Sequence, residues 1–153
     1  MNHAKNVYGY DSIEVADASR ALSKALIINK SFENEFYYEC AQRAFKIAKE
    51  IFINSNAKLI AYKISYSLAL QWKSVNSNII EIKKVNINDA FNLAQQALES
   101  CVNVFGEKNI ATAKIYRLIG SIFYYMERFE EFFCFIVLNI SMHKINKLKN
   151  QRQ

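Results

Sequence analysis

The sequence contains no proline and only three glycines among its 153 residues, Gly9, Gly106 and Gly120. Both residue types interrupt regular structure, so their scarcity favours long helices joined by few tight turns. A parallel α/β enzyme would normally need more glycine at its strand–helix turns. The three glycines are also isolated from one another, so they cannot form a glycine-rich loop that cradles phosphate.

Histidine and cysteine are also scarce, which limits the chemistry that the chain can perform. The two histidines, His3 and His143, lie near opposite ends of the sequence, and Cys40, Cys101 and Cys134 are widely spaced. Nucleophilic catalysis with a histidine base would need one of these histidines held rigidly, and a metal site would need clustered ligands. We therefore expect no enzyme, no catalytic residue, no metal and no cofactor. We interpret the cysteines as buried, reduced thiols of an intracellular protein.

Long apolar runs are missing too. The opening residues, MNHAKNVYGYDS, contain no apolar segment of a signal peptide. The most apolar run, Phe132–Leu138, is far shorter than the ~20 residues of a membrane helix. We therefore expect no transmembrane segment and a cytoplasmic location, with nuclear or cytoskeletal association left open.

The net charge of +6 is concentrated at one end of the chain. The last eleven residues contain no acid and carry most of this charge. The remainder of the chain is only mildly basic, so we expect no nucleic-acid partner. The cations of this basic tail are Lys144, Lys147, Lys149 and Arg152.

Apolar residues recur every three or four positions, which predicts six helices in three pairs. Ser12 is a candidate N-cap for the first helix, and Gly106 is a candidate C-terminal cap for the fourth. The asparagine-rich stretch 74–89 is interpreted mostly as a loop, although a short helix within it stays open. The six helices are expected at about 12–29, 34–53, 56–74, 87–105, 110–126 and from about 129 onward.

A repeated spacing accompanies these helices. Tyr8-Gly9 precedes Ala16 with the same spacing as Phe105-Gly106 precedes Ala113, and Phe52 lies one residue further from Ala61. The alanines are 45 and 52 residues apart, and we expect them to mark equivalent sites. Without a β signal, this recurrence predicts an all-α solenoid of about three helical hairpins. The expected array covers residues 1–131, with units of about 8–53, 54–105 and 106–131 onward, followed by an atypical final helix and basic tail over 132–153.

One segment carries a family resemblance. The segment FGEKNIATAKIYRLIGSIFYYMERFEE, residues 105–131, resembles tetratricopeptide repeats, in particular the longer repeats of the kinesin-light-chain style. The large, aliphatic, small and aromatic places of a first helix are taken by Tyr116, Ile119, Gly120 and Phe123, with the small residue admitting the second helix of the pair. The matching residues of the two earlier units are Ser65, Leu68, Ala69 and Trp72, and Ser19, Leu22, Ser23 and Leu26. Phe132 departs from the pattern, because a small residue is expected there.

Within that family, residues 7–131 resemble adaptors that recognise substrates for cullin–RING ubiquitin ligases. The resemblance rests on VYGYDSIEVA, on NDAFNLAQQAL and on FGEKNIATAKIYRLIG. It implies a protein-binding role, with C-terminal degron peptides as substrates and ligase components as partners. It also implies a link to amyloid precursor protein and to its intracellular transport along microtubules.

The first helix of each pair lines the concave surface in solenoids of this family. Opposite its packing stripe, each such helix offers residues spaced by three, four and three, which form one face. Cations and aromatic rings on such a face suit an extended peptide that carries acidic residues or a free carboxylate. These faces are Asp17, Arg20, Lys24 and Ile27; Lys63, Tyr66, Leu70 and Lys73; and Lys114, Arg117, Ser121 and Tyr124. The expected peptide-contact residues are Arg20, Lys24, Lys63, Tyr66, Lys73, Lys114, Arg117 and Tyr124.

Other interpretations of these residues stay open. Lysine and arginine are ordinary on a solvated helix face, so the chain could be a structural spacer within an array. A kinesin-light-chain-like cargo adaptor would share the fold and differ only in its partner. Phe123, Tyr124 and Tyr125 could stack on single-stranded RNA, although the mild charge of the body argues against this.

Overall fold

The computed structural model describes residues 11–128 and, beyond them, positions 130, 134, 137, 138, 144, 147, 148, 151 and 152. All regular secondary structure in this described part is helical, which confirms the predicted all-α class. The sixth predicted helix falls largely on residues outside the description. The elements are α2 (Ile13–Ile28), the short 3-10 helix η1 (Glu33–Glu35), α3 (Phe36–Ile51), α4 (Asn56–Asn76), α5 (Ile80–Phe105) and α6 (Ile110–Tyr125).

Polar side chains and one glycine set the helix ends. Ser12 caps α2 by accepting a hydrogen bond from the Val15 amide at 3.3 Å, and Asn109 caps α6 by accepting one from the Ala111 amide at 2.8 Å. Such caps satisfy amides that have no partner within the helix. Gly106 follows α5 with φ +82°, a backbone conformation that other residues rarely adopt. The two predicted caps, Ser12 and Gly106, are therefore confirmed.

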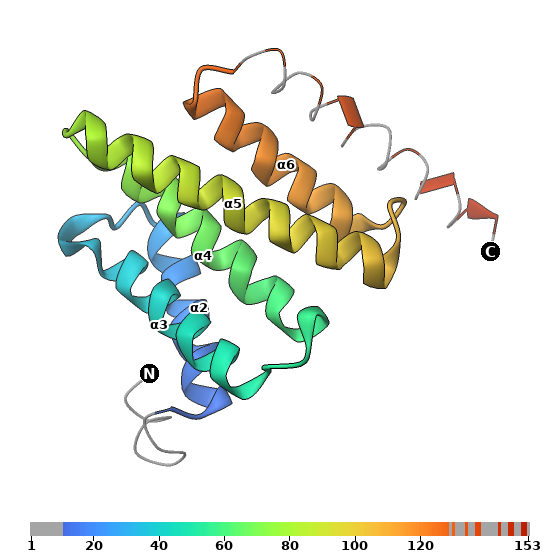
Figure 1. Cartoon of the computed structure of the whole chain (residues 1–153), viewed down its shortest axis with the longest axis horizontal. Helices are drawn as coiled ribbons and strands as arrows, with labels where there is room; N and C mark the ends of the chain where they lie inside the picture. The colour runs from blue at the N-terminus through green and yellow to red at the C-terminus, as the bar shows by residue number, and fades with distance from the viewer. Residues whose placement is uncertain are drawn as a thin grey trace.

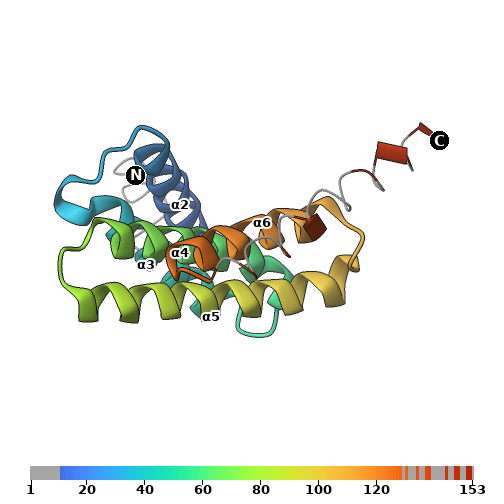
Figure 2. The same ribbon diagram turned by 90° about the horizontal axis from the view of Figure 1, so that it is seen from above.

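Successive helices pack against one another as helical hairpins, and α4 also contacts both α2 and α6. Figure 1 shows the hairpins following one another, with the long helices α4 and α5 side by side. In Figure 2, α2 and α5 lie at opposite edges of the molecule with α4 and α6 between them. The molecule is therefore an all-α solenoid of helical hairpins, as predicted. The exact boundaries proposed for the repeat units remain a prediction.

Two buried serines identify equivalent positions in the hairpins. The Ser23 hydroxyl of α2 donates to the carbonyl of Tyr37 in α3 at 2.7 Å. The Ser67 hydroxyl of α4 likewise donates to the carbonyl of Ala90 in α5 at 2.6 Å. The two serines have the same role, which is to join the first helix of a hairpin to the backbone of the second.

This register corrects the predicted equivalence of the three alanines. In α6 the corresponding position is Gly120, the small residue of the predicted repeat pattern. Ala16, Ile60 and Ala113 lie seven residues before Ser23, Ser67 and Gly120, and all three are buried. Ala61 is exposed, so the prediction is wrong for the middle helix. The middle site is occupied by Ile60, whose spacing from Phe52 then equals that of the other two pairs. Residue type alone favours Ala61 for this site, whereas burial depends on the position of a residue around the helix.

The small residue expected in the middle unit is also displaced. Ala69 is fully buried, but it packs with Tyr37 and Ala41 of α3 rather than against α5. The close approach of α5 occurs at Ser67, where the side chain is equally small. Ala69 therefore packs at the contact between successive hairpins and not at the contact between α4 and α5.

The asparagine-rich stretch is mostly helical, contrary to its interpretation as a loop. α4 continues to Asn76 and α5 begins at Ile80, so only residues 77–79 connect them. The Ser74 hydroxyl donates to the Lys83 carbonyl at 2.8 Å, and Ile87 is buried against the core. These tertiary contacts with α4 outweigh the weak helix preference of asparagine and β-branched residues.

The cysteine prediction holds for part of the chain. Cys40 and Cys101 are buried and unpaired with other cysteines, as expected, but Cys134 is exposed. No helix among the described residues is long and apolar enough to cross a membrane. Neither does the described part contain a group of three or more histidine, cysteine or acidic side chains that could hold a metal ion.

Candidate functional site: a groove along the first helices

A pocket of about 220 Å³ lies between α2 and α4, the first helices of two successive hairpins. The α2 wall carries the cations Arg20 and Lys24, and the α4 wall is mainly aliphatic. The pocket therefore combines positive charge with apolar surface. Its lining is Arg20, Ser23, Lys24 and Ile27 from α2 and Ala61, Ile64, Ser65 and Leu68 from α4.

The same face continues from α4 to α6. The Gln71 side chain of α4 donates from Nε2 to the Ser121 hydroxyl of α6 at 2.6 Å. Arg117 lies one turn before Ser121 on the same side of α6, and Lys114 lies one turn before Arg117. Both cations are exposed. The helices α4 and α6 are thus joined along their common face.

We call the alignment of the three helices on Ser23, Ser67 and Gly120 the serine register. In this register, the groove face is a set of equivalent positions. On it, α2 and α6 contribute four cations and one carboxylate, whereas α4 contributes an aliphatic strip. The groove face consists of Asp17, Arg20, Lys24 and Ile27; Ala61, Ile64, Leu68 and Gln71; and Lys114, Arg117, Ser121 and Tyr124. The predicted faces of α2 and α6 are the ones that meet here.

The predicted face of α4 is displaced by two residues. A helix turns by about 100° per residue, so Lys63 lies nearly opposite Ala61. Leu70 is buried in the core formed with α5 and α6. Lys63 lies near Lys49 of α3 and Glu99 of α5. Burial is the main cause that lowers the pKa of Lys63. The charge of Lys49 lowers this pKa further, and the charge of Glu99 opposes the change.

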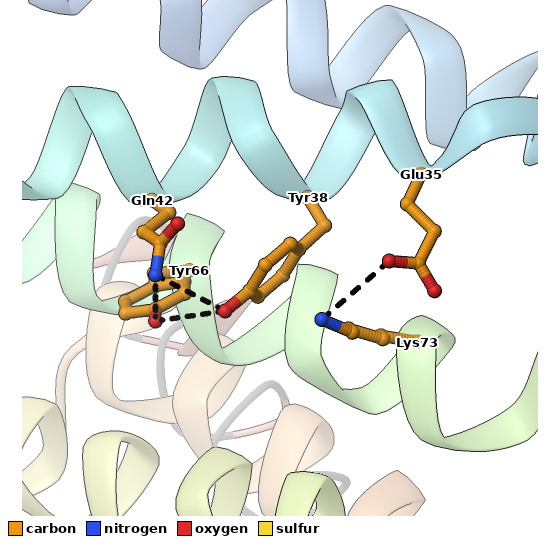
Figure 3. Close-up of polar contacts among 5 residues, drawn as sticks. All are labelled: Glu35, Tyr38, Gln42, Tyr66 and Lys73. Carbon is orange, nitrogen blue, oxygen red and sulfur yellow. Dashed lines mark hydrogen bonds and ion pairs between the residues drawn. The ribbon is translucent and has the colours of Figure 1, made fainter. Parts of the chain in front are cut away.

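Tyr66 and Lys73, the other two α4 candidates, lie against α3 (Figure 3). The Tyr66 and Tyr38 hydroxyls are 3.5 Å apart, and Gln42 Nε2 donates to both, at 3.3 Å and 3.1 Å. Lys73 Nζ lies 3.5 Å from a Glu35 carboxylate oxygen and 3.7 Å from the Tyr38 ring centroid. The structure thus places Arg20, Lys24, Lys114, Arg117 and Tyr124 on the groove face, and Lys63, Tyr66 and Lys73 away from it.

Burial raises the pKa of Tyr66 to about 12, with the hydrogen bond to Tyr38 as the second cause. The Tyr66 phenol therefore acts as a hydrogen-bonding group inside the contact between hairpins. This joint cluster, formed by Glu35, Tyr38, Gln42, Tyr66 and Lys73, connects α3 to α4 and contributes to the stacking of one hairpin on the next.

At the α2 end of the groove face, Arg20 lies beside a hydrogen-bonded tyrosine. The Tyr62 hydroxyl donates to Asp17 Oδ1 at 2.5 Å, and the Arg20 guanidinium carbon lies 5.5 Å from the Tyr62 ring centroid. Burial raises the pKa of Tyr62, and the hydrogen bond from its hydroxyl to Asp17 raises it further. Arg20 Nε is buried and has no hydrogen-bond partner among the described residues, while the rest of the side chain lines the pocket.

The sequence interpretation missed the aliphatic wall of the pocket. Leu68 was assigned to the packing stripe of the repeat, and Ile64 was not considered. The available signal was the run Ala61, Ile64 and Leu68, whose spacing of three and four matches that of the α2 face. A larger depression of about 660 Å³, near the start of α5 and the end of α6, contains none of the predicted contact residues.

The fold and the groove face define a helical-hairpin solenoid with a mixed cationic and apolar groove. No family model matches the chain. The chain is similar to amyloid protein-binding protein 2 from Rattus norvegicus and from Mus musculus, with 26% identity over 129 residues in each case. The match covers 82% of this chain, and the chain spans 22% of the length of these relatives.

Proposed function

We propose that this chain is a tetratricopeptide-type module that binds an extended peptide along the groove face. The pocket between α2 and α4 carries the proposal, because it places Arg20 and Lys24 opposite Ile64 and Leu68. An arginine fork can bind a carboxylate through two hydrogen bonds, and the aliphatic wall can bury an apolar side chain. The favoured ligand is a peptide with an acidic residue or a free C-terminal carboxylate next to an aliphatic side chain.

We further propose that the module serves as a substrate-recognition adaptor of a cullin–RING ubiquitin ligase and binds C-terminal degron peptides. The similarity to amyloid protein-binding protein 2 supports a protein partner. By the same similarity, amyloid precursor protein is a candidate partner, with a link to its transport along microtubules. The module acts without catalysis in this proposal, in the cytoplasm and in association with the nucleus or cytoskeleton.

The first test measures peptide binding directly. Fluorescence anisotropy would compare a short labelled peptide of alternating glutamate and leucine with the same peptide bearing an amidated C-terminus. We expect amidation to weaken binding, because it removes one carboxylate from the reach of Arg20 and Lys24. The double variant Arg20→Glu/Lys24→Glu should weaken binding of the free peptide by at least about tenfold, since two attractive contacts become repulsive.

The matched control changes the same charges away from the groove. Lys46 and Lys49 of α3 are exposed and lie outside the groove face, so Lys46→Glu/Lys49→Glu should leave the affinity nearly unchanged. Equal binding of free and amidated peptides would exclude recognition of the terminal carboxylate. If both double variants bound like the parent chain, the groove would have no binding role and the spacer interpretation would stand. Stronger capture of a kinesin-light-chain cargo peptide than of degron peptides would favour the cargo-adaptor interpretation.

A further inference from the structure

We infer that Tyr62 is a positioning residue that keeps Arg20 available to the bound peptide by holding Asp17 in a hydrogen bond. This inference rests on the proposed function of the groove face and adds the residue that sets its local charge. Tyr62 does not line the pocket, and it acts through Asp17 and Arg20, which lie on the neighbouring helix α2.

Asp17 and Arg20 are natural partners for an ion pair, because residues three apart on a helix lie next to each other. In the described part of the chain, Asp17 instead accepts a hydrogen bond from the Tyr62 hydroxyl at 2.5 Å. Lys73 and Glu35 form an ion pair in the joint cluster, away from Asp17 and Arg20. The carboxylate nearest to Arg20 along α2 is therefore already engaged.

Arg20 is held in place without being neutralised. Its guanidinium lies over the Tyr62 ring, with 5.5 Å between the guanidinium carbon and the ring centroid. Its Nε is buried without a hydrogen-bond partner, and its side chain lines the pocket with Lys24. Because the Arg20 side chain lines the pocket, a carboxylate that enters can pair with its guanidinium.

The Tyr62 hydroxyl is a dependable donor in this arrangement. Tyr62 is only 5% exposed and packs in a core cluster with residues of α2 and α3, so its ring has a fixed position. Burial and the hydrogen bond to Asp17 both raise its pKa, so the phenol keeps its proton throughout the neutral range. The Asp17 carboxylate thus stays engaged under all conditions in which the peptide would bind.

Of the two described contacts between first helices, only the one between α2 and α4 has this arrangement. In the serine register, the positions that correspond to Asp17, Arg20 and Tyr62 in the contact between α4 and α6 are Ala61, Ile64 and Ile115. None of these side chains carries a charge or a hydrogen-bonding group. The ligand carboxylate is therefore expected at the α2 side of the pocket, with its aliphatic neighbour against α4.

The test is a cycle of Tyr62→Phe, Asp17→Asn and the double variant, measured with the labelled glutamate–leucine peptide. Phenylalanine keeps the ring under Arg20 and removes the hydroxyl, which releases Asp17 to pair with Arg20. We expect Tyr62→Phe to weaken binding by about fivefold, the upper range for an ion pair near the surface. Asp17→Asn is the reference for the double variant, in which this carboxylate can no longer pair with Arg20, so the double variant should recover the affinity that Tyr62→Phe loses.

A second measurement does not depend on the peptide. The NMR signal of the Arg20 Nε–H group should shift in Tyr62→Phe as Asp17 approaches, and it should return in the double variant. Thermal unfolding of each variant would confirm that the chain remains folded. Unchanged affinity and an unchanged Arg20 signal in Tyr62→Phe would overturn the inference, as would equally weak binding by the single and double variants. If the parent chain bound no peptide while the Arg20 signal responded as described, the proposed function would fail and the role of Tyr62 in positioning Arg20 would stand.

Discussion

Arg20 and Lys63 are both cations near the middle of a first helix, yet their surroundings differ completely. Arg20 lines a pocket beside an aliphatic wall. Lys63 lies on the other side of the solenoid, half-buried between Lys49 and Glu99, and its pKa is lowered chiefly by burial. A change of two residues in register turns a helical position by about 200°, so it is enough to exchange a ligand contact for a packing contact.

Tyr66 allows a test at the scale of the residue. Its pKa is raised from 10.0 to about 12, so the folded state holds the phenolic proton more tightly than the unfolded state does. The resulting stability is fully present below pH 10 and is lost as the pH rises through 12. We expect the free energy of unfolding to fall less steeply over this interval in Tyr66→Phe than in the parent chain. Urea titrations at several alkaline pH values would measure the two slopes.

The control removes one hydroxyl group at an exposed position of the same solenoid. Ser31 is exposed and its hydroxyl does not titrate over this interval, so Ser31→Ala should keep the steep decline of the parent chain. A Tyr66→Phe variant that declined as steeply as the parent chain would show that Tyr66 is not the source of this pH dependence.

At the scale of the element, α5 shows how packing extends a helix beyond its own preference. Its first turns contain asparagine and β-branched residues, and Ile80, Ile82 and Val85 are exposed. They remain helical beside the end of α4, where Ser74 reaches the Lys83 carbonyl and Ile87 enters the core. A short isolated helix of this composition would be marginal in water, so the extension depends on its neighbour.

Removing the Ser74 hydroxyl tests this dependence. We expect Ser74→Ala to lower the free energy of unfolding by about 1 kcal/mol, the usual net value of one hydrogen bond. The loss should be local, with faster amide hydrogen exchange over residues 80–86 and little change in α2 or α3. Asn78→Ala, at an exposed position of the connection, is the control and should leave exchange unchanged. Equal exchange in Ser74→Ala and the parent chain would contradict this account of α5.

At the scale of the whole molecule, the groove face combines contributions from the three helices α2, α4 and α6. Its cations lie on α2 and α6, the two outer first helices, and α4 separates them with an aliphatic strip. Packed helices lie about 8–10 Å apart, so the two cationic pairs are separated by roughly 20 Å. An extended chain advances by about 3.3 Å per residue, so a peptide of about six residues can contact both pairs.

This geometry predicts a dependence on peptide length. We expect Lys114→Glu/Arg117→Glu to weaken binding of a long acidic peptide by about tenfold, since two contacts are reversed. A peptide too short to reach α6 from the α2 pocket should bind the variant and the parent chain equally. Anisotropy titrations with peptides of increasing length would show where the two affinities begin to differ. A uniform loss at every length would contradict a groove that extends from α2 across α4 to α6.

The features that could be predicted from the sequence are those that depend on residues close together along the chain. The caps Ser12 and Gly106, the helical class and the faces of α2 and α6 follow from residues within a few positions of each other, so they could be derived without coordinates. The apolar neighbours of Cys134 along the chain predict a buried thiol, but Cys134 is exposed. Its burial depends on which segments cover that stretch, and the sequence does not contain that information locally.

By itself, the sequence determined that this protein is a stack of helices with cations on exposed faces, because spacing and residue type control helix formation and amphipathicity. Only the tertiary structure decided which side of α4 faces the groove, since that helix contacts α2, α3, α5 and α6 and has apolar residues toward each of them. A helix surrounded by neighbours has no single polar stripe to indicate its outer side. The hydrogen bonds from Ser67 to α5 and from Gln71 to α6 are consistent with the rotation that this packing gives α4, in which Ile64 and Leu68 lie opposite Arg20 and Lys24.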